Sequence, residues 1–262
     1  MIPNCALFVG DNVEVLRREV ADNSVQLTVT SPPYDNLRKY NGFTWDFESV
    51  ASELYRVTKP GGVVVWIVAD ATVNGSETGT SFRQALYFKD IGFNLHDTMI
   101  WEKAGTGACG SVFAYWSSFE YMFVFSKGRP VFNAIEDVPN GSAGKLKTNS
   151  ARRKVTGEHK EEVRKVGKEF SRRTNVWRTA IGVDSRRYSE LKAHPAIFPE
   201  QLAADHIFSW SNPGDLVLDP FLGSGTTGKM ALLNSRRFIG CDISSSYVDL
   251  AEGRIRKALA VP

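Results

Sequence analysis

The sequence predicts an α/β protein with a mostly parallel sheet covered by helices. Short apolar runs such as Val25–Val29 and Leu216–Leu218 are rich in β-branched residues, which indicates strands. Between such runs lie segments such as Phe47–Val57, where apolar residues recur at helical spacing. A glycine-rich stretch at 219–228 separates a strand signal from a helix signal. Alternation of strands and helices favours parallel pairing, because each helical crossover brings the chain back to the end of the sheet where the previous strand began.

The predicted elements follow in chain order. Strands are expected over residues 5–9, 25–30, 62–69, 96–101, 120–126, 215–219 and 237–241, and helices over 47–58, 80–91, 226–234 and 245–259. The first of these helices ends before Pro60-Gly61-Gly62, because proline and glycine stop a helix. The longest apolar run, Val63–Ala69, is too short to cross a bilayer, so no membrane is expected.

Composition points to an intracellular globular protein. The 262 residues suffice for one large or two small domains. No basic segment followed by a long apolar one opens the chain, so secretion is not expected. The three cysteines, Cys5, Cys109 and Cys241, are widely spaced and form no metal-ligand pattern. We expect them to stay reduced in a cytoplasm, and we expect no metal.

Charge is distributed unevenly along the chain. The formal net charge is +3, yet residues 145–192 hold fifteen Lys or Arg against six Asp or Glu. The remainder is therefore acidic overall. Such segregation is expected where one region binds a polyanion, although a solvated loop with no partner is the simpler alternative. Phe170, Trp177 and other apolar residues interrupt the basic stretch and argue that part of it is folded.

The first candidate motif is Thr30-Ser31-Pro32-Pro33-Tyr34, directly after a predicted strand. The two prolines stiffen the turn and remove two N–H donors, so the carbonyls there can only accept hydrogen bonds. A hydroxyl, an accepting carbonyl and an aromatic ring would form a pocket for a flat group that bears an NH2. A proline turn with a packing tyrosine explains the same residues equally well.

The second candidate motif is the glycine-rich stretch Asp219–Gly228, between a predicted strand and a predicted helix. Backbone N–H groups and the dipole at a helix N-terminus attract a carboxylate or phosphate. Asp242 ends the next predicted strand, about 20 residues later, where an acid commonly binds ribose hydroxyls. The implied ligand has an anionic end, a ribose and an aromatic base.

A nucleoside triphosphatase is a rival interpretation of the same glycines. Gly223–Lys229 fits the triphosphate-binding loop as far as its lysine. That loop next needs Ser or Thr to hold magnesium, and this chain has Met230, whose thioether is a poor ligand for a hard cation. The sequence therefore disfavours this alternative.

Taken together, the two motifs resemble those of the S-adenosylmethionine-dependent DNA amino-methyltransferases. Their order, catalytic motif first and cofactor turn last, is similar to the permuted beta class of that family. Further matching segments are Gly10-Asp11, Arg56–Gly62, Glu120–Lys127 and Lys192–Leu202. The resemblance covers most of the chain outside about 130–190. It implies a seven-stranded, mostly parallel, Rossmann-like sheet with one reversed strand and helices on both faces, with S-adenosylmethionine as cofactor.

The resemblance also implies roles for the first motif. An exocyclic amino group is a weak nucleophile, because its lone pair is delocalised into the ring. Ser31 Oγ and the Pro32 carbonyl would accept its two hydrogens, with Pro33 stiffening the loop. Tyr34 would stack on a base flipped out of the duplex, which offsets part of the few kcal/mol that flipping costs.

Cofactor contacts are expected mainly from the second motif. Phe221 and Asp11 would lie beside the adenine, and Asp242 would bind the ribose. The remaining expected contacts are Thr30, His194, Pro195, Phe198, Asp219, Pro220, Gly223, Ser224, Gly225, Thr226 and Thr227, around the amino-acid end. His194 could equally be structural, and Phe198 could equally be core.

The target base is not fixed by the residues alone. In the resembled family, Ser before Pro-Pro-Tyr is more often linked to cytosine N4, and Asp or Asn to adenine N6. We therefore favour cytosine N4, with adenine N6 as the alternative. Methylation of cytosine carbon-5 is disfavoured, because it needs a cysteine thiolate, usually from a Pro-Cys pair, and no cysteine here follows a proline. The sequence also leaves open an RNA or protein methyltransferase, and a DNA-binding regulator without catalysis.

The expected organisation has three parts. Residues 1–129 form the catalytic half, 130–190 a basic target-recognition insert, and 191–262 the cofactor-binding half of the same domain. Expected DNA contacts are Arg38, Lys39, Arg152, Arg153, Lys154, Arg172 and Arg173. The expected partner is double-stranded DNA in the cytoplasm, at the nucleoid. A homodimer and a cognate restriction endonuclease are compatible with the resemblance.

Overall fold

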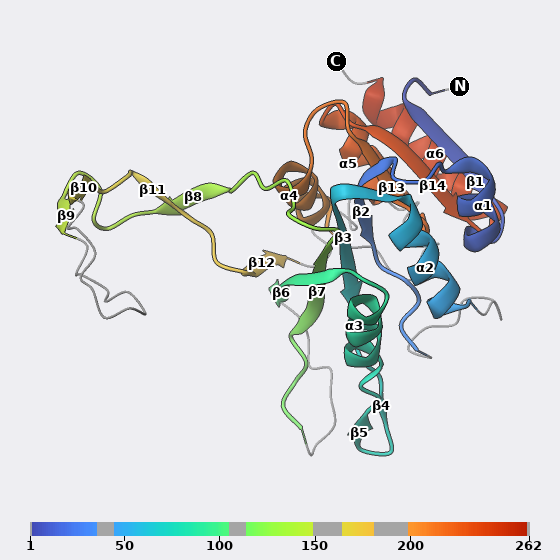
Figure 1. Ribbon diagram of the computed structural model, residues 1–262, viewed down its shortest axis with the longest axis horizontal. Coiled ribbons are helices and arrows are strands. Elements are labelled where there is room, and N and C mark those ends of the chain that lie inside the picture. The colour runs from blue at the N-terminus through green and yellow to red at the C-terminus, as the bar shows by residue number, and fades with distance from the viewer. Residues whose placement is uncertain (1, 36–44, 105–113, 149–163, 181–198, 261–262) are drawn as a thin grey trace. The chain divides into compact units, whose positions relative to one another are not determined.

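The computed structural model of the chain describes residues 2–35, 45–104, 114–148, 164–180 and 199–260. Their main feature is an eight-stranded sheet (Figure 1). Its strands, from one edge to the other, are β1 (Cys5–Val9), β14 (Arg237–Asp242), β13 (Leu216–Asp219), β2 (Val25–Thr30), β3 (Thr58–Val68), β7 (Phe119–Ser126), β6 (Asn94–Ala104) and β12 (Val176–Ala180).

All neighbours in this sheet are parallel except β7, which runs antiparallel to both β3 and β6. The expected mostly parallel sheet with one reversed strand is confirmed. The count differs by one, because β12 adds an edge strand beside β6. Its residues lie in the basic stretch, whose charges mask the short alternation around the buried Trp177.

Helices cover both faces of the sheet in two rows. The first row is α1 (Asn12–Glu19), α2 (Phe47–Val57) and α3 (Thr80–Asp90); the second is α4 (Glu200–Trp210), α5 (Thr226–Leu233) and α6 (Ser245–Leu259). Figure 1 shows these rows on opposite faces. This is the arrangement that right-handed crossovers between parallel strands produce. In the described part of the chain, no helix has the length and apolar character needed to span a bilayer.

Two helices, α1 and α4, were not expected. α1 is short and polar, and it begins where the Asp11 side chain accepts a hydrogen bond from the Glu14 backbone N–H, at 3.1 Å. An aspartate in this position satisfies one of the free N–H groups of the first turn. α4 is buried around most of its circumference, so it lacks a one-sided apolar pattern.

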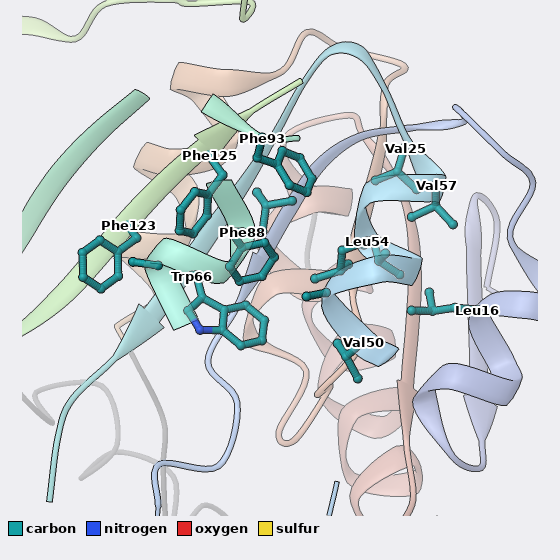
Figure 2. Close-up of a cluster of buried hydrophobic side chains, with 14 of the residues drawn as sticks. Leu16, Val25, Val50, Leu54, Val57, Trp66, Phe88, Phe93, Phe123 and Phe125 are labelled. Atoms are coloured by element: carbon teal, nitrogen blue, oxygen red, sulfur yellow. The ribbon is translucent and has the colours of Figure 1, made fainter. Parts of the chain in front are cut away.

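An aromatic core joins the first helix row to the sheet (Figure 2). Trp66 of β3, Phe88 of α3 and Phe125 of β7 are fully buried. The rings of Phe88 and Phe125 stack with their centroids 4.5 Å apart. The Trp66 indole N–H donates to Gln84 Oε1 at 2.9 Å, so its one polar atom is satisfied. This core fixes the strands that end at the candidate site.

Residues Ala134–Thr174 form a separate compact unit. Within it β8 (Glu136–Pro139) pairs antiparallel with β11 (Phe170–Arg172), and β9 (Leu146–Thr148) pairs antiparallel with β10 (Arg164–Val166). The expected insert at 130–190 contains this unit but also β12, which belongs to the main sheet. A small hairpin, β4 (Thr72–Val73) and β5 (Ser76–Glu77), lies in the main unit.

Candidate active site

The two sequence motifs meet at the carboxyl ends of two adjacent parallel strands. β2 and β13 pair with Leu27 opposite Val217 and Thr28 opposite Leu218. From β2 the chain crosses to β3 over one face, and from β13 it crosses to β14 over the other face. Strands that diverge in this way leave a crevice at their carboxyl ends, where ligands of open α/β sheets bind.

Buried hydrogen bonds join the early and late motifs. Thr30 Oγ1 donates to Asp219 Oδ1 at 2.7 Å. Thr227 Oγ1, in the first turn of α5, donates to the Val29 carbonyl at 3.0 Å. These contacts connect residues almost 200 positions apart in the chain. The expectation that both motifs belong to one site therefore agrees with the contacts.

Asp219 is the most deeply buried acid of this site, with 2% of its surface exposed. Its Oδ1 also accepts the Phe221 backbone N–H at 3.1 Å. Burial raises the pKa of Asp219 to about 6, although the hydrogen bonds from Thr30, Phe221 and Thr227 act in the opposite direction. The local donors thus offset only part of the cost of burying this carboxyl group.

The glycine-rich turn needs its glycines for conformation and space. Gly223 and Gly225 have φ values of 47° and 75°, in the left-handed region. A Cβ on Gly225 would also lie 2.6 Å from the Ala251 Cβ on α6. Arg254 of α6 donates to the Ser224 carbonyl, which fixes the turn from behind. The first-turn N–H groups of α5 follow the turn, and such groups attract an anion.

Asp242 closes the other side of the crevice, at the end of β14. Its Oδ2 accepts the Gly223 N–H and its Oδ1 the Ser244 N–H, each at 3.0 Å. Burial raises its pKa. Each carboxylate oxygen can accept a second hydrogen bond, so Asp242 can also bind ribose hydroxyls. The turn, the α5 N-terminus and this acid together fit a nucleoside that carries a carboxylate, as S-adenosylmethionine does.

An aromatic group lies next to the turn. The Phe221 ring, half-buried, contacts the Trp45 ring edge-on with the centroids 4.9 Å apart, and it contacts Trp66 in the same way at 6.2 Å. Trp45 was not singled out from the sequence. It precedes α2, and only its place beside Phe221 in the fold connects it with the site.

The Ser-Pro-Pro-Tyr loop carries a chain of hydrogen bonds. Ser31 Oγ lies 2.6 Å from the Tyr34 hydroxyl, which in turn donates to Glu120 Oε2 at 2.8 Å. Lys103 pairs with the other oxygen of the Glu120 carboxylate. Glu120 on β7 and Lys103 on β6 were not expected in the site. The only signal in the sequence was a glutamate at the start of an otherwise apolar strand.

Several expected site residues lie outside the described part of the chain. They are Arg38, Lys39, Arg152, Arg153, Lys154, His194, Pro195 and Phe198. Arg172 and Arg173 belong to the separate unit of residues 134–174. The Arg173 Nε donates to both carboxylate oxygens of Asp137, at 2.8 and 3.0 Å. Pro32 and Pro220 are buried beside the site loops.

The fold and the crevice define a class of protein, the α/β proteins with a nucleoside-binding crevice, here beside a Ser-Pro-Pro-Tyr loop. Residues 25–253 match the family model described as DNA methylase, which unites the N6 and N4 methyltransferases. The chain belongs to this family, the S-adenosylmethionine-dependent DNA amino-methyltransferases. The resemblance noted from the sequence is thereby confirmed, and the cofactor is S-adenosylmethionine.

Individual relatives align with this chain over more than nine-tenths of its length. The orphan methyltransferase M.BamHII of Bacillus amyloliquefaciens is 52% identical over an alignment of 248 residues, and the match covers 92% of this chain and 92% of its own. The type II methyltransferase M.BglII of Bacillus subtilis is 29% identical and covers 94% of this chain and 67% of its own.

Solved structures show the same fold. The PvuII DNA methyltransferase, named cytosine-N4-specific, matches with a TM-score of 0.68 at 20% identity, over 98% of this chain and 92% of its own. A DNA modification methylase of Thermus thermophilus, TTHA0409, solved with S-adenosyl-L-methionine, matches with a TM-score of 0.62 at 25% identity, over 98% and 96%.

Proposed function

We propose that this DNA methyltransferase modifies the N4 amino group of cytosine within a short sequence of double-stranded DNA. The observation that carries the proposal is Ser31 at the head of the loop, with its hydroxyl beside the Tyr34 hydroxyl at 2.6 Å. A neutral serine suits an amino group that needs acceptors for its hydrogens but no full negative charge. The fold match to a methyltransferase named cytosine-N4-specific points in the same direction.

The catalytic roles follow from the loop. S-adenosylmethionine supplies a methyl group already activated by a positively charged sulfur. Ser31 Oγ and the Pro32 carbonyl accept the two amino hydrogens, which orients the nitrogen lone pair away from them and toward the cofactor crevice. Pro33 keeps the loop rigid, and Tyr34 contacts the flipped base. Positioning of this kind can supply a large part of a rate enhancement.

The cofactor roles follow from the crevice. We assign Asp242 to the ribose, Phe221 and Asp11 to the adenine, and the α5 N-terminus at Thr226 and Thr227 to the carboxylate. The turn residues Gly223, Ser224 and Gly225, together with Thr30, Asp219 and Pro220, shape the amino-acid end. His194, Pro195 and Phe198 are proposed as further contacts at that end.

We propose that residues 130–190, which include the unit of residues 134–174, recognise the target sequence, and that residues 1–129 and 191–262 form the two halves of the catalytic domain. Arg172 is exposed on β11, so its side chain can reach a phosphate. Arg38, Lys39, Arg152, Arg153, Lys154 and Arg173 are the other proposed DNA contacts. Charge reversal of Arg172 should weaken DNA binding and flatten its salt dependence. Unchanged affinity and salt slope would remove it from the interface.

The target base is tested by analysis of host DNA. The protein is expressed in a host that lacks this modification, the DNA is digested to nucleosides, and the methylated nucleoside is identified by mass spectrometry. N4-methylcytosine supports the proposal. N6-methyladenine would contradict the choice of base, and methyl transfer to RNA alone would contradict DNA as the substrate. Sequencing that detects modified bases then gives the target sequence.

A further inference from the structure

The Ser-Pro-Pro-Tyr loop is connected to two residues, Glu120 and Lys103, that were not expected in the site from the sequence. Four side chains form one chain of contacts: Ser31, Tyr34, Glu120 and Lys103. Ser31 and Tyr34 come from the loop after β2, Glu120 from β7 and Lys103 from β6. Glu120 is buried, with 6% of its surface exposed, although a carboxylate is rarely placed where so little water reaches it.

We propose that Glu120, held by Lys103, is a positioning residue that fixes the direction of these hydrogen bonds, so that Ser31 Oγ can only accept from the target base. The inference rests on the proposed function of the loop. It adds a reason why the site selects an amino group and rejects a carbonyl group at the same position of the base.

The direction follows from the chemistry of each group. A lysine ammonium can only donate, and a carboxylate can only accept. The Tyr34 hydroxyl has one proton, and it donates that proton to Glu120 Oε2 at 2.8 Å. The contact of 2.6 Å between Tyr34 and Ser31 must then use the Ser31 proton. Ser31 Oγ is left with lone pairs alone to offer to the base.

The opposite direction is disfavoured by burial. If Tyr34 donated to Ser31 instead, the Glu120 oxygen that faces it would lose its donor in a place where water cannot replace it easily. An unsatisfied buried charged group is costly. Lys103 stabilises the carboxylate from its other oxygen, and the sheet fixes both residues. Glu120 of β7 lies opposite Trp101 of β6, and Lys103 is two residues after Trp101 on β6.

The consequence for the substrate is a selectivity. Cytosine presents an N4 amino group, which donates to Ser31 Oγ and binds. Uracil presents a carbonyl oxygen at the same position, which meets the lone pairs of Ser31 Oγ and is repelled. The same reasoning separates adenine from hypoxanthine, so it does not depend on which amino base is the target.

Glu120→Gln tests the inference directly, because glutamine has the size of glutamate but can reverse the direction of the hydrogen bond with Tyr34. Lys103 can donate only to the glutamine oxygen, which turns the glutamine NH2 toward Tyr34. Tyr34 then accepts from glutamine and donates to Ser31, so Ser31 is free to donate to the base. Tyr34→Phe acts at a different point, since it removes the hydroxyl and leaves the Ser31 proton without its partner. The matched control is Glu102→Gln, on the neighbouring strand position, whose carboxylate pairs with Arg178 at the surface.

The experiment measures three quantities on each purified full-length variant. They are the turnover on duplex DNA containing the target, the affinity for S-adenosylmethionine, and the ratio of affinities for duplexes with cytosine or uracil at the target position. A uracil opposite guanine is easier to flip, but this effect is common to all variants and cancels when the ratios are compared. Thermal unfolding shows that each variant is folded.

We expect Glu120→Gln and Tyr34→Phe to lower turnover by about tenfold or more and to leave cofactor affinity within about twofold, since the hydrogen bonds that they change lead to Ser31 and Lys103. The preference for cytosine over uracil should fall about fivefold or more, most in Glu120→Gln. The double variant should be no slower than the slower single variant, because both act through one chain. Glu102→Gln should behave as the unmodified protein does.

The inference would be overturned if folded Glu120→Gln and Tyr34→Phe kept the cytosine-to-uracil affinity ratio of the unmodified protein. Normal turnover of Glu120→Gln would also overturn it. If Glu120→Gln does not fold, Tyr34→Phe provides the same readout. Failure of the proposed function is distinguishable, because the unmodified protein would then leave cytosine in the target duplex unmethylated. A purely structural role for Glu120 would lower turnover and stability together and leave the cytosine-to-uracil ratio unchanged.

Discussion

Two threonines of β2 offer a matched pair for testing the contact between the catalytic and cofactor motifs. Thr28 and Thr30 are both fully buried and lie on the same strand. Thr30 Oγ1 donates to Asp219 Oδ1 at 2.7 Å. Thr28 Oγ1 is the buried side-chain atom that lacks a hydrogen-bond partner among the residues that the structure describes. Thr30→Val and Thr28→Val remove the same hydroxyl and replace it with a methyl of similar size.

The two substitutions should have opposite effects on the free energy of unfolding. Loss of a hydrogen bond to a charged acceptor costs about 1.5–3 kcal/mol, so Thr30→Val should be destabilising by that amount. Removal of an unsatisfied buried hydroxyl gains about 1–3 kcal/mol, so Thr28→Val should be neutral or stabilising. The effect of Thr30→Val should be larger at pH 8 than at pH 5, because Asp219, with its pKa at about 6, is ionised only at the higher pH.

Urea unfolding, extrapolated to zero denaturant at both pH values, measures these differences. The unfolding slope should stay unchanged, which shows that the comparison is between similar folded and unfolded states. Equal destabilisation by the two variants would refute the reasoning, because it would mean that the hydroxyl contact of Thr30 with Asp219 contributes nothing specific. A pH-independent effect of Thr30→Val would refute the part that concerns the charge on Asp219.

Three other perturbations test separate parts of the account. Burial lowers the pKa of His206 to about 3, so as the pH falls the unfolded state binds a proton on this histidine before the folded state does. The free energy of unfolding should therefore fall below about pH 6.5, by about 1.4 kcal/mol per pH unit. His206→Gln should flatten this slope in acid unfolding. Phe88→Ala should cost about 3–5 kcal/mol in urea unfolding, because it empties a fully buried ring position against Phe125. Asp242→Asn should weaken S-adenosylmethionine binding by roughly tenfold or more in calorimetry, and unchanged affinity would remove Asp242 from the ribose site.

Much of the fold could be predicted because its signals are local. β2 and β13 are apolar and rich in branched residues, and α2 has a clear helical period, so their positions follow from the sequence. β12 could not be predicted in the same way. Its five residues lie among basic neighbours, and its pairing with β6 depends on a strand about 75 positions away. The strand propensity of such a segment depends on its partner more than on its own residues.

The contacts of the candidate site could likewise be predicted only in part from the sequence. The meeting of Thr30 with Asp219 could be anticipated, because each follows a parallel strand and such ends share one edge of the sheet. The contacts of Glu120 with Tyr34 and with Lys103 could not be anticipated. They depend on the register of the antiparallel pair β6 and β7, which no local pattern specifies.

We propose that Ser31 binds the target amino group while a separate crevice binds the cofactor. The most direct test compares Ser31→Ala with the unmodified protein, measuring methyl transfer to DNA and S-adenosylmethionine affinity on the same preparations. We expect turnover to fall on the order of a hundredfold or more, because one transition-state hydrogen bond is lost, while cofactor affinity stays within about twofold. Near-normal turnover, or loss of cofactor binding in parallel with activity, would contradict this division of roles.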